Sequence, residues 1–369
     1  MKVTIQRAAL FRLLQMISGV VERRQTLPIL ANVLVTVDET SLSLTATDME
    51  IELVASATLT EPSVPGMITV SARKLLDICR ALPEDAVITL ALEGDHAVLR
   101  SGRSRFLLTT LPTEDFPAVQ DCPFSIEFSM DQSRLQKVIG KVHFAMGQQD
   151  VRHYLNGALF EIDKGVLRCI ATDGHRLAYS FADSIDAGAV QAKVILPRKS
   201  VLELVRLLDA NSEENVTVCI GENHFRVKSS DFIFTSRLIN AQYPDYDKLI
   251  PRNIENTAIA DRDLFKQALT RASILSNEKF RGVRLHLDQD NLRIVANNPE
   301  QEEAEEMMQM EYQGNGMEIG FNVTYLLDVV SAISSTDIHW SCGGDPNSGV
   351  VFRPSEQDDS LYVVMPMRL

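Results

Sequence analysis

The strongest constraint on this chain is a threefold internal repeat. Three similar segments lie 125 residues apart: Ala46–Met49 (ATDM), Ala171–Gly174 (ATDG) and Ala296–Pro299 (ANNP). A second marker, two adjacent apolar residues followed by an acid, recurs at Leu75–Asp77, Val201–Glu203 and Leu326–Asp328, with spacings of 126 and 125. This period is too long for a helical solenoid and suits a small domain. The 369-residue chain is therefore predicted to contain three homologous domains.

Each repeat shows the same order of expected elements. It opens with a strand, at Lys2–Gln6, Ser125–Ser129 and Thr257–Ala260. A helix follows, at Ala8–Gly19, Ser133–Ala145 and Arg262–Leu275, with apolar residues at helical spacing. Alternating strands then lead to a second helix, at Arg73–Ala81, Lys199–Leu208 and Tyr325–Ser334, and to three more strands. Each repeat is therefore predicted to be α+β, with two helices on one side of antiparallel sheet.

Two segments rich in proline and acids are predicted to be linkers between the repeats. They are Pro112–Asp121 and Tyr243–Pro251. The predicted domains are accordingly residues 1–120, 125–248 and 252–369.

Composition excludes several classes of protein. Hydrophobic residues make up 45% and charged residues 23% of the chain, an ordinary globular composition. No stretch approaches the ~18 apolar residues that span a bilayer, and the N-terminus lacks the apolar core of a signal peptide. The five cysteines match no zinc-binding spacing, and an odd number of scattered thiols suits a reducing compartment. We expect a cytoplasmic protein with no membrane partner and no metal site.

Charge is distributed unevenly along the chain. The net charge of −14, if spread uniformly, would repel nucleic acid. The six expected helices with their flanking loops carry 19 basic and 7 acidic residues, a net +12, so the remainder carries −26. A solvated amphipathic face explains one basic helix, but five of six indicate a shared surface that faces a polyanion. Because no single recognition helix is apparent, contacts to phosphates are expected.

No motif supports catalysis. Asp173 and His175 resemble an acid–base pair, but adjacency in sequence is not catalytic geometry, and lining a pocket is the favoured role. Asp48, Glu50, Glu52 and the glutamate run at 302–306 could form a two-metal nuclease site, yet they alternate along a strand or lie in a surface run. No phosphate-binding loop, GxGxxG or HExxH is present. We expect no catalytic residue and no cofactor, and we keep a metal-dependent nuclease and a sequence-specific repressor as alternatives.

The C-terminal tail is unusual because Val363–Leu369 is apolar almost throughout and has methionines on both sides of a proline. Such residues form an adaptable binding surface, although an edge strand with core methionines is an alternative.

The two ends of the row of repeats are complementary in charge, and both carry apolar residues. Arg103–Leu108 is basic and apolar, whereas Ile274 and Leu275 accompany an acidic run at 302–306. A head-to-tail contact between copies is predicted, with a solvated helix face as the alternative for the glutamates.

Five stretches make the whole chain similar to the bacterial sliding clamps, the beta subunits of DNA polymerase III. They are Thr26–Leu30 (TLPIL), Ala171–Leu177 (ATDGHRL), Ile274–Arg284 (ILSNEKFRGVR), Asn297–Glu306 (NNPEQEEAEE) and Val363–Leu369 (VVMPMRL). The resemblance implies a head-to-tail homodimer that forms a closed ring, with helices lining a hole occupied by duplex DNA. It also implies a non-catalytic processivity factor that tethers replicative and repair polymerases without sequence-specific contacts and that an ATP-driven clamp loader opens.

The resemblance further implies three sets of site residues. The DNA-contacting positions are Arg24, Arg73, Gln149, His153 and Tyr154, and the family usually has tyrosine where His153 stands. A hydrophobic pocket for peptides of polymerases and the clamp loader would consist of Leu155, Thr172, Gly174, His175, Arg176, Leu177, Pro244, Lys248, Asn322, Tyr325, Val363, Met365, Pro366, Met367, Arg368 and Leu369. The family commonly has arginine at the position of Lys248, and lysine lacks its planar fork. The dimer interface would join Lys74, Ile78, Arg103, Arg105, Phe106 and Leu108 to Ile274, Leu275, Glu302, Glu303, Glu305 and Glu306.

Overall fold

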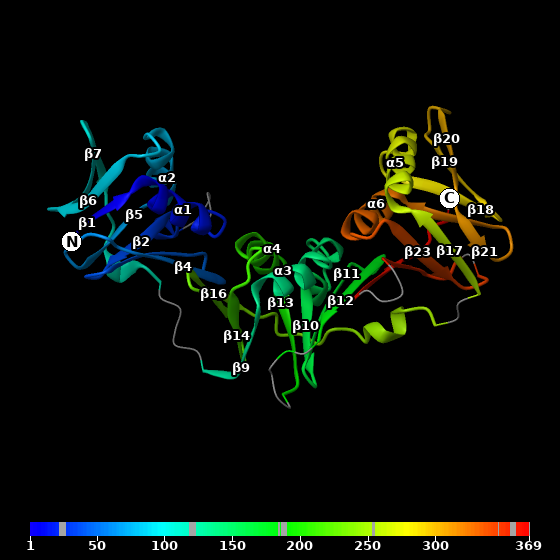
Figure 1. Cartoon of the computed structure of the whole chain (residues 1–369), viewed down its shortest axis with the longest axis horizontal. Helices are drawn as coiled ribbons and strands as arrows, with labels where there is room; N and C mark the ends of the chain where they lie inside the picture. Colours follow the sequence, from blue (N-terminus) through cyan, green and yellow to red (C-terminus); the bar gives the residue numbers. More distant parts are fainter. Residues whose placement is uncertain are drawn as a thin grey trace. The chain divides into compact units, whose positions relative to one another are not determined.

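The computed structural model describes residues 1–21, 27–117, 123–183, 185, 190–252, 255–345, 347–354 and 359–368, and one order of elements recurs three times in it (Figure 1). The first repeat contains β1 (Lys2–Gln6), α1 (Arg7–Ile17), β2 (Asn32–Val37), β3 (Ser41–Thr47), β4 (Ile51–Thr58), β5 (Gly66–Ser71), α2 (Ala72–Ala81), β6 (Val87–Glu93), β7 (His96–Ser101) and β8 (Ser104–Thr109). The second contains β9 (Phe124–Asp131), α3 (Gln132–Gly140), β10 (Gly157–Asp163), β11 (Val166–Thr172), β12 (Arg176–Ala182), β13 (Ala192–Pro197), α4 (Arg198–Leu207), β14 (Asn215–Gly221), β15 (His224–Lys228) and β16 (Phe232–Arg237). The third contains β17 (Asn256–Asp261), α5 (Arg262–Ala272), β18 (Gly282–Asp288), β19 (Asn291–Asn297), β20 (Glu303–Gln309), β21 (Glu311–Gln313), β22 (Met317–Asn322), α6 (Val323–Ala332), β23 (Asp337–Cys342), β24 (Val350–Arg353) and β25 (Ser360–Val364).

The six predicted helices are confirmed, and some of their ends have local causes. Ser71, Asp261 and Asn322 begin α2, α5 and α6 by accepting hydrogen bonds from backbone amides of the first turn. α3 ends at Gly140 rather than at the predicted Ala145, since glycine is a poor helix former, and the chain continues as a 3-10 turn, η3 (His143–Ala145). Among the described residues, none of the helices has the length and apolar character needed to cross a bilayer.

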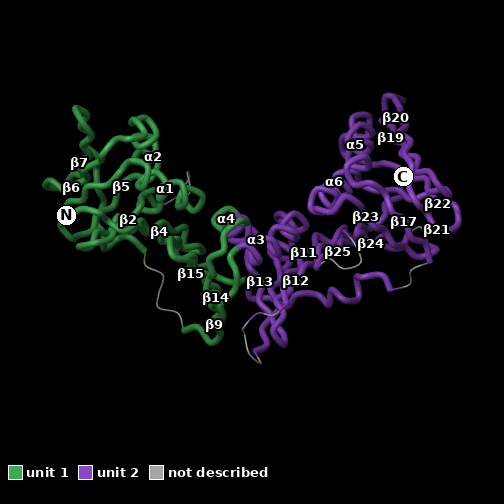
Figure 2. The backbone as a smooth tube through the Cα atoms, viewed as in Figure 1, with its two compact units in different colours: residues 1–132, 206–238 green, residues 133–205, 239–369 purple. Residues whose placement is uncertain are grey.

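Two compact units make up the described chain (Figure 2): residues 1–132 with 206–238, and residues 133–205 with 239–369. The first unit contains sheets with the strand orders β1-β6-β7-β8 and β5-β2-β3-β4-β16-β15-β14-β9. The second contains the orders β13-β10-β11-β12-β25-β24-β23-β17-β21 and β20-β19-β18-β22. Each long sheet therefore continues from one repeat into the next, through the antiparallel pairs β4·β16 and β12·β25.

Helices cover the sheets within each unit, as the α+β prediction expects. α1 packs beside α2 and on β3 and β4 in the first unit, and α5 packs beside α6 in the second (Figure 1). The apolar stripe of α1, which is Leu10, Leu13, Leu14 and Ile17, is buried. The helix periodicity read from the sequence therefore identifies the core-facing side.

The predicted linker Tyr243–Pro251 is more ordered than its composition suggests. It contains a short 3-10 helix, η5 (Tyr246–Leu249), and the buried Tyr246 packs into a cluster that includes Leu159 and Ile195. Residues 118–122 of the first linker lie outside the described residues, but Phe116 before them is buried against Ile29 and Leu30. Aromatic residues thus anchor both connections to the domains.

Candidate functional site

A tight turn between β11 and β12 forms one side of the candidate site. The Thr172 hydroxyl donates to the carbonyl oxygen of Arg176 (2.6 Å) and accepts from the amide of Gly174 (3.1 Å). Asp173 Oδ1 accepts from the amides of His175 (2.9 Å) and Arg176 (3.0 Å). Gly174 has a φ of 88°, a region that glycine adopts without strain. The turn is therefore held by its own short polar side chains.

The turn between β3 and β4 in the first repeat makes the same hydrogen bonds. Thr47 Oγ1 donates to the carbonyl oxygen of Ile51 (2.8 Å) and accepts from the amide of Met49 (3.1 Å). Asp48 Oδ1 accepts from the amides of Glu50 (2.9 Å) and Ile51 (2.7 Å). The described residues contain no group of three His, Cys, Asp or Glu side chains that could hold a metal ion. The segments ATDM and ATDG thus fold into one kind of turn, in which the aspartate has a structural role.

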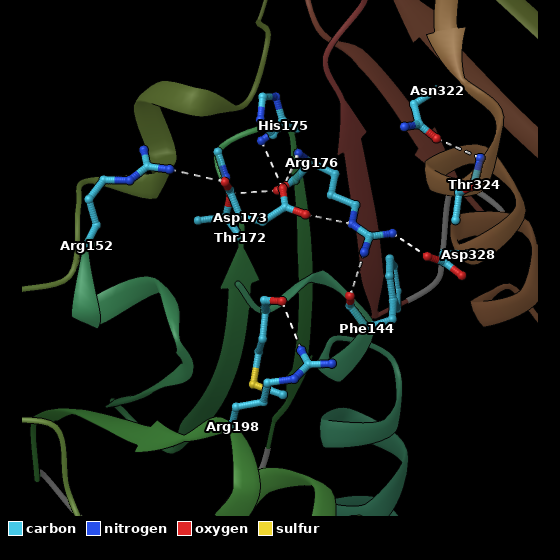
Figure 3. Close-up of polar contacts among 12 residues, drawn as sticks. Phe144, Arg152, Thr172, Asp173, His175, Arg176, Arg198, Asn322, Thr324 and Asp328 are labelled. Carbon is cyan, nitrogen blue, oxygen red and sulfur yellow. Dashed lines mark hydrogen bonds and ion pairs between the residues drawn. The ribbon is translucent and has the colours of Figure 1, made fainter. Parts of the chain in front are cut away.

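Arg176, the first residue of β12, connects this turn to the third repeat (Figure 3). Its side chain is 11% exposed and lies 3.1 Å from the Asp173 carboxylate. It also donates to Asp328 of α6 and to the carbonyl oxygen of Phe144 (2.8 Å). The rings of Phe144 and Tyr325 lie 5.2 and 4.6 Å from its guanidinium carbon. A cation with this many partners holds the two repeats together, and its loss leaves two carboxylates without their partner.

A mostly apolar cavity of about 280 Å³ opens beside the turn, within the second unit. We call it the docking cavity, and it is lined by Arg152, Tyr154, Leu155, Thr172, Gly174, Arg176, Leu177, Pro244, Leu249, Val363 and Met365. Arg152 donates to the carbonyl oxygen of Asp173 (3.3 Å; Figure 3) and to the Asp150 carboxylate (2.9 and 3.0 Å). The guanidinium of Arg152 lowers the pKa of Asp150 to about 2. This ion pair orients the basic residue at the cavity wall.

The linker after the second repeat supplies another wall through Pro244 and Leu249. Tyr246, which lies between them, is buried and donates its hydroxyl to Glu161 Oε2 (2.9 Å). The ring of Tyr243 meets Tyr154 edge-on, with 6.5 Å between centroids. Burial raises the pKa of Tyr246, so its hydroxyl keeps its proton and remains a donor. These contacts fix the linker as a wall of the docking cavity.

The C-terminal strand β25 completes the docking cavity. Val363 is opposite Leu177 in the β12·β25 pair, and the amide of Met365 donates to the carbonyl oxygen of His175 (2.8 Å). The amide of Met367 then donates to Gly320 of the third repeat (2.9 Å). The alternative of an edge strand with core methionines is wrong, because β25 is paired on both sides and Met365 is 41% exposed.

Half of the predicted pocket residues line the docking cavity: Leu155, Thr172, Gly174, Arg176, Leu177, Pro244, Val363 and Met365. Four others have roles nearby. His175 stacks on Tyr325, and the Tyr325 ring covers Arg176. Lys248 pairs with Asp245 (2.9 Å), and Asn322 caps α6. Pro366, Met367 and Arg368 follow in the tail, and Leu369 lies outside the described residues. Arg152 and Leu249 also line the docking cavity but were not predicted from the sequence. Leu249 could have been found, because it is an apolar residue in a polar linker.

The predicted DNA-contacting residues lie on several elements. Arg73 is exposed on α2, 3.7 Å from Asp77. Gln149 (φ 55°) and His153 are exposed, with His153 on a short 3-10 helix, η4 (His153–Leu155). Tyr154 follows His153 but packs on Tyr243 and lines the docking cavity. Arg24 lies outside the described residues.

Some basic residues of the helices and their flanking loops are neutralised within the chain. Arg12 pairs with Asp231, Lys141 with Asp359, and Arg271 with Glu306 (2.6 Å). The excess positive charge of the helices is therefore smaller than their composition indicates.

The predicted dimer residues concentrate at two sheet edges and on a neighbouring helix. β8 and β20 are the terminal strands of the four-stranded sheets in the described chain. On or just before β8, Arg103 and Arg105 are exposed and Phe106 is half-buried, while Lys74 and Ile78 lie on α2. Near or on β20, Glu302, Glu303 and Glu305 are exposed, Glu306 and Leu275 are half-buried, and Ile274 is 75% exposed.

The structure adds one exposed leucine to these edges and corrects one expectation. Leu108 is buried in its own domain, whereas Leu107 beside it is 54% exposed, because successive residues of a strand point to opposite faces. The acidic run is not a solvated helix face but an edge strand, in which Glu305 lies 2.7 Å from Arg293.

Three family models together span nearly the whole chain. They describe the N-terminal domain (residues 1–120), the central domain (129–245) and the C-terminal domain (247–368) of the DNA polymerase III beta subunit. The chain belongs to the DNA polymerase III beta subunit family. The curated beta sliding clamps of Pseudomonas aeruginosa and Escherichia coli K12 are 50% and 48% identical to it over 369 residues, which is all of both chains. The crystal structure of a Pseudomonas aeruginosa sliding clamp bound to griselimycin matches with a TM-score of 0.96 and 49% identity over 100% of both chains.

Membership in this family gives the broad function. The chain is a DNA sliding clamp, a replication factor and not an enzyme. The resemblance read from the five sequence stretches is confirmed, and the three-domain α+β architecture is confirmed with it.

Proposed function

We propose that two copies of this chain close head to tail into a ring around duplex DNA, with helices lining the hole, and that the docking cavity tethers polymerases and the clamp loader. Each copy would contribute three domains, residues 1–120, 125–248 and 252–369. The ring would work in the cytoplasm without a cofactor. Arg24, Arg73, Gln149, His153 and Tyr154 would contact DNA, giving position without sequence readout.

One observation carries the ring proposal: the same strand pair recurs at each junction between repeats. β4, β12 and β20 hold equivalent places in the three repeats, and so do β8, β16 and β25. β4 pairs with β16, and β12 pairs with β25. β20 and β8 are the remaining members of the two sets, and each has an open edge in the described chain. Open edges favour pairing with another chain, so β20 of one copy would pair with β8 of the next.

The internal junctions also predict the register of this pair. Glu52 faces Thr235 across β4·β16, and Leu177 faces Val363 across β12·β25. We align the strands by counting residues from the hairpin that precedes each one. The residue equivalent to Glu52 and Leu177 is then Glu303 on β20, and the residue equivalent to Thr235 and Val363 is Leu107 on β8. An antiparallel pair in this register places Arg105 opposite Glu305. Opposite charges would then meet at the centre of the contact.

Cysteine cross-linking tests the ring contact and its register. A chain with Leu107→Cys and Glu303→Cys is expected to form a covalent dimer under mild oxidation, because residues directly opposite in a sheet lie within disulfide reach. A matched chain with Leu107→Cys and Glu305→Cys places the thiols two residues out of register and is expected to cross-link poorly. Equal cross-linking of both chains, or none of either, would contradict the proposed pair.

The shape and chemistry of the docking cavity support tethering of partner peptides. Its lining is mostly apolar and includes the partly exposed Met365, a side chain that adapts to varied partners. Deletion of residues 365–369 is expected to abolish polymerase binding and to leave the dimer intact. Unchanged affinity for polymerase in this variant would contradict the assignment.

A further inference from the structure

A second cavity, of about 400 Å³, lies against the same linker that forms a wall of the docking cavity. We call it the acidic cavity, and its polar lining includes Glu161, Lys193, Asp245, Tyr246 and Asp247. Pro244 lines both cavities. A chain segment that leaves the docking cavity over Pro244 therefore enters the acidic cavity.

Carboxylates outnumber basic groups in the acidic cavity. Glu161 on β10 is 12% exposed, lies 3.4 Å from Lys193 of β13, and accepts the Tyr246 hydroxyl. Asp245 pairs with Lys248 (2.9 Å). Asp247 lies within ion-pair distance of no basic side chain in the described part of the chain. A bound cation would therefore find one carboxylate that is not already engaged.

Aromatic rings make the lining more specific than charge alone. Tyr243, which is partly exposed, lines the acidic cavity beside the carboxylates, whereas Tyr246 is buried and donates its hydroxyl to Glu161. A guanidinium group can stack on a tyrosine ring while it donates two hydrogen bonds to a carboxylate, whereas an ammonium acts as a point charge. The combination of Asp247 with the Tyr243 ring fits an arginine side chain.

Building on the proposed docking function, we propose that the acidic cavity binds an arginine that flanks the docking segment of a partner peptide. An extended peptide advances ~3.3 Å per residue, so a flank of one or two residues spans Pro244. Partners with such an arginine would be preferred over partners with a neutral residue there. The acidic cavity would thus rank partners that compete for the same docking cavity.

Fluorescence anisotropy with the full-length protein tests this proposal. The probes are labelled peptides of leucine, phenylalanine and alanine, with either arginine or its neutral isostere citrulline at one end, and each end is tried in turn. At one of the two ends, arginine is expected to strengthen binding about fivefold over citrulline, the size of a favourable partly exposed ion pair. Asp247→Asn is expected to bring this ratio close to one, and Lys193→Gln is expected to raise it. Glu278→Gln, an exposed acid outside both cavities, serves as the matched control and should keep the wild-type ratio.

The outcomes separate this proposal from the docking function. If both peptides bind equally at either end while Met365→Ala weakens both, the arginine site is wrong and docking stands. If neither peptide binds, or if Met365→Ala has no effect, the docking function fails and the arginine site fails with it. If the ratio of arginine to citrulline affinity falls equally in Asp247→Asn and Glu278→Gln, the preference for arginine comes from the overall charge of the protein. That result would overturn the proposal.

Discussion

The junction between the first and second repeats and the junction between the second and third are built from equivalent strands but differ at one turn. The first has Leu27, Met49 and Ile51 where the second, 125 residues later, has Arg152, Gly174 and Arg176. Both turns keep the same hydrogen bonds. In the first, Ile51 is buried, and Leu27 and Met49 are 50% and 47% exposed. Strand pairing therefore sets the architecture of a junction, and a few side chains at the turn decide whether it also carries a binding site.

The largest expected effect, on the free energy of unfolding, comes from replacing the arginine of the second junction. Arg176→Ala leaves Asp173 and Asp328 without their shared cation and is expected to destabilise the second unit by about 3 kcal/mol. Trp340, the single tryptophan of the chain, lies in this unit and reports its unfolding in urea by fluorescence. Arg134→Ala, which removes an exposed pair with Asp183 in the same unit, should cost less than about 1 kcal/mol. Equal losses in the two variants would show that Arg176 has no special role.

The proposed third junction, between β8 and β20 of two copies, can be broken by charge. Arg105→Glu would place like charges opposite Glu305 and is expected to raise the dimer dissociation constant about 30-fold, which corresponds to ~2 kcal/mol. Sedimentation at several concentrations measures this change. Combining Arg105→Glu with Glu305→Arg should restore most of the affinity. A double variant as weak as the single one would contradict the register.

The difference between the two turns predicts a smaller effect on peptide binding. Gly174→Met copies the residue of the first repeat, where Met49 adopts a similar φ of 79°. A Cβ at position 174 would lie 3.1 Å from Arg152 Nη2, so the guanidinium of Arg152, which lines the docking cavity, must shift by a few tenths of an ångström to make room. We expect peptide affinity to fall about tenfold, or ~1.4 kcal/mol, in a titration by anisotropy. Met49→Gly is the matched control, and a similar loss there would contradict the assignment of the docking cavity.

The smallest expected effect concerns the ion pair that orients Arg152. The pKa of Asp150 is lowered from 3.8 to about 2 by the hydrogen bonds of Arg152. Because this pKa is lower in the folded state, the pair stabilises the fold above pH ~4, and this contribution is lost as the pH falls towards 2. NMR titration of the carboxyl carbon should therefore show Asp150 fully ionised at pH 4, and Arg152→Gln, which keeps the backbone hydrogen bond from residue 152, should raise the midpoint towards 3.8. A wild-type midpoint near 3.8 would contradict this geometry.

Local patterns predicted most of the fold because they reflect local physics. β1 was predicted at its observed bounds, and the apolar stripe of α1 identified its buried face. The period of 125 residues predicted the equivalence of the turns at Thr47 and Thr172, which the hydrogen bonds bear out. The places of the helices among the strands along each repeat were predicted from the periodicity of polar and apolar residues, whereas the strand orders within the sheets were not.

Features that depend on distant strands could not be predicted from local patterns. The docking cavity needs β12 beside β25, which lies more than 170 residues later, and needs the linker held down by Tyr246. Arg152 is not predicted as a site residue from the sequence, because nothing in its neighbourhood along the chain indicates that it contacts the turn at Asp173. The exposure of Leu107 could not be predicted, because hydrophobicity alone does not say which face of β8 is covered.

Retention on circular DNA tests the central claim of a closed ring most directly. Protein loaded by a clamp loader onto a nicked circular plasmid is separated by gel filtration before and after a single cut linearises the plasmid. We expect the protein to stay with the circle and to be lost from the linear form, because a ring leaves a duplex only over its ends. Loss at the same rate from both forms would contradict encirclement.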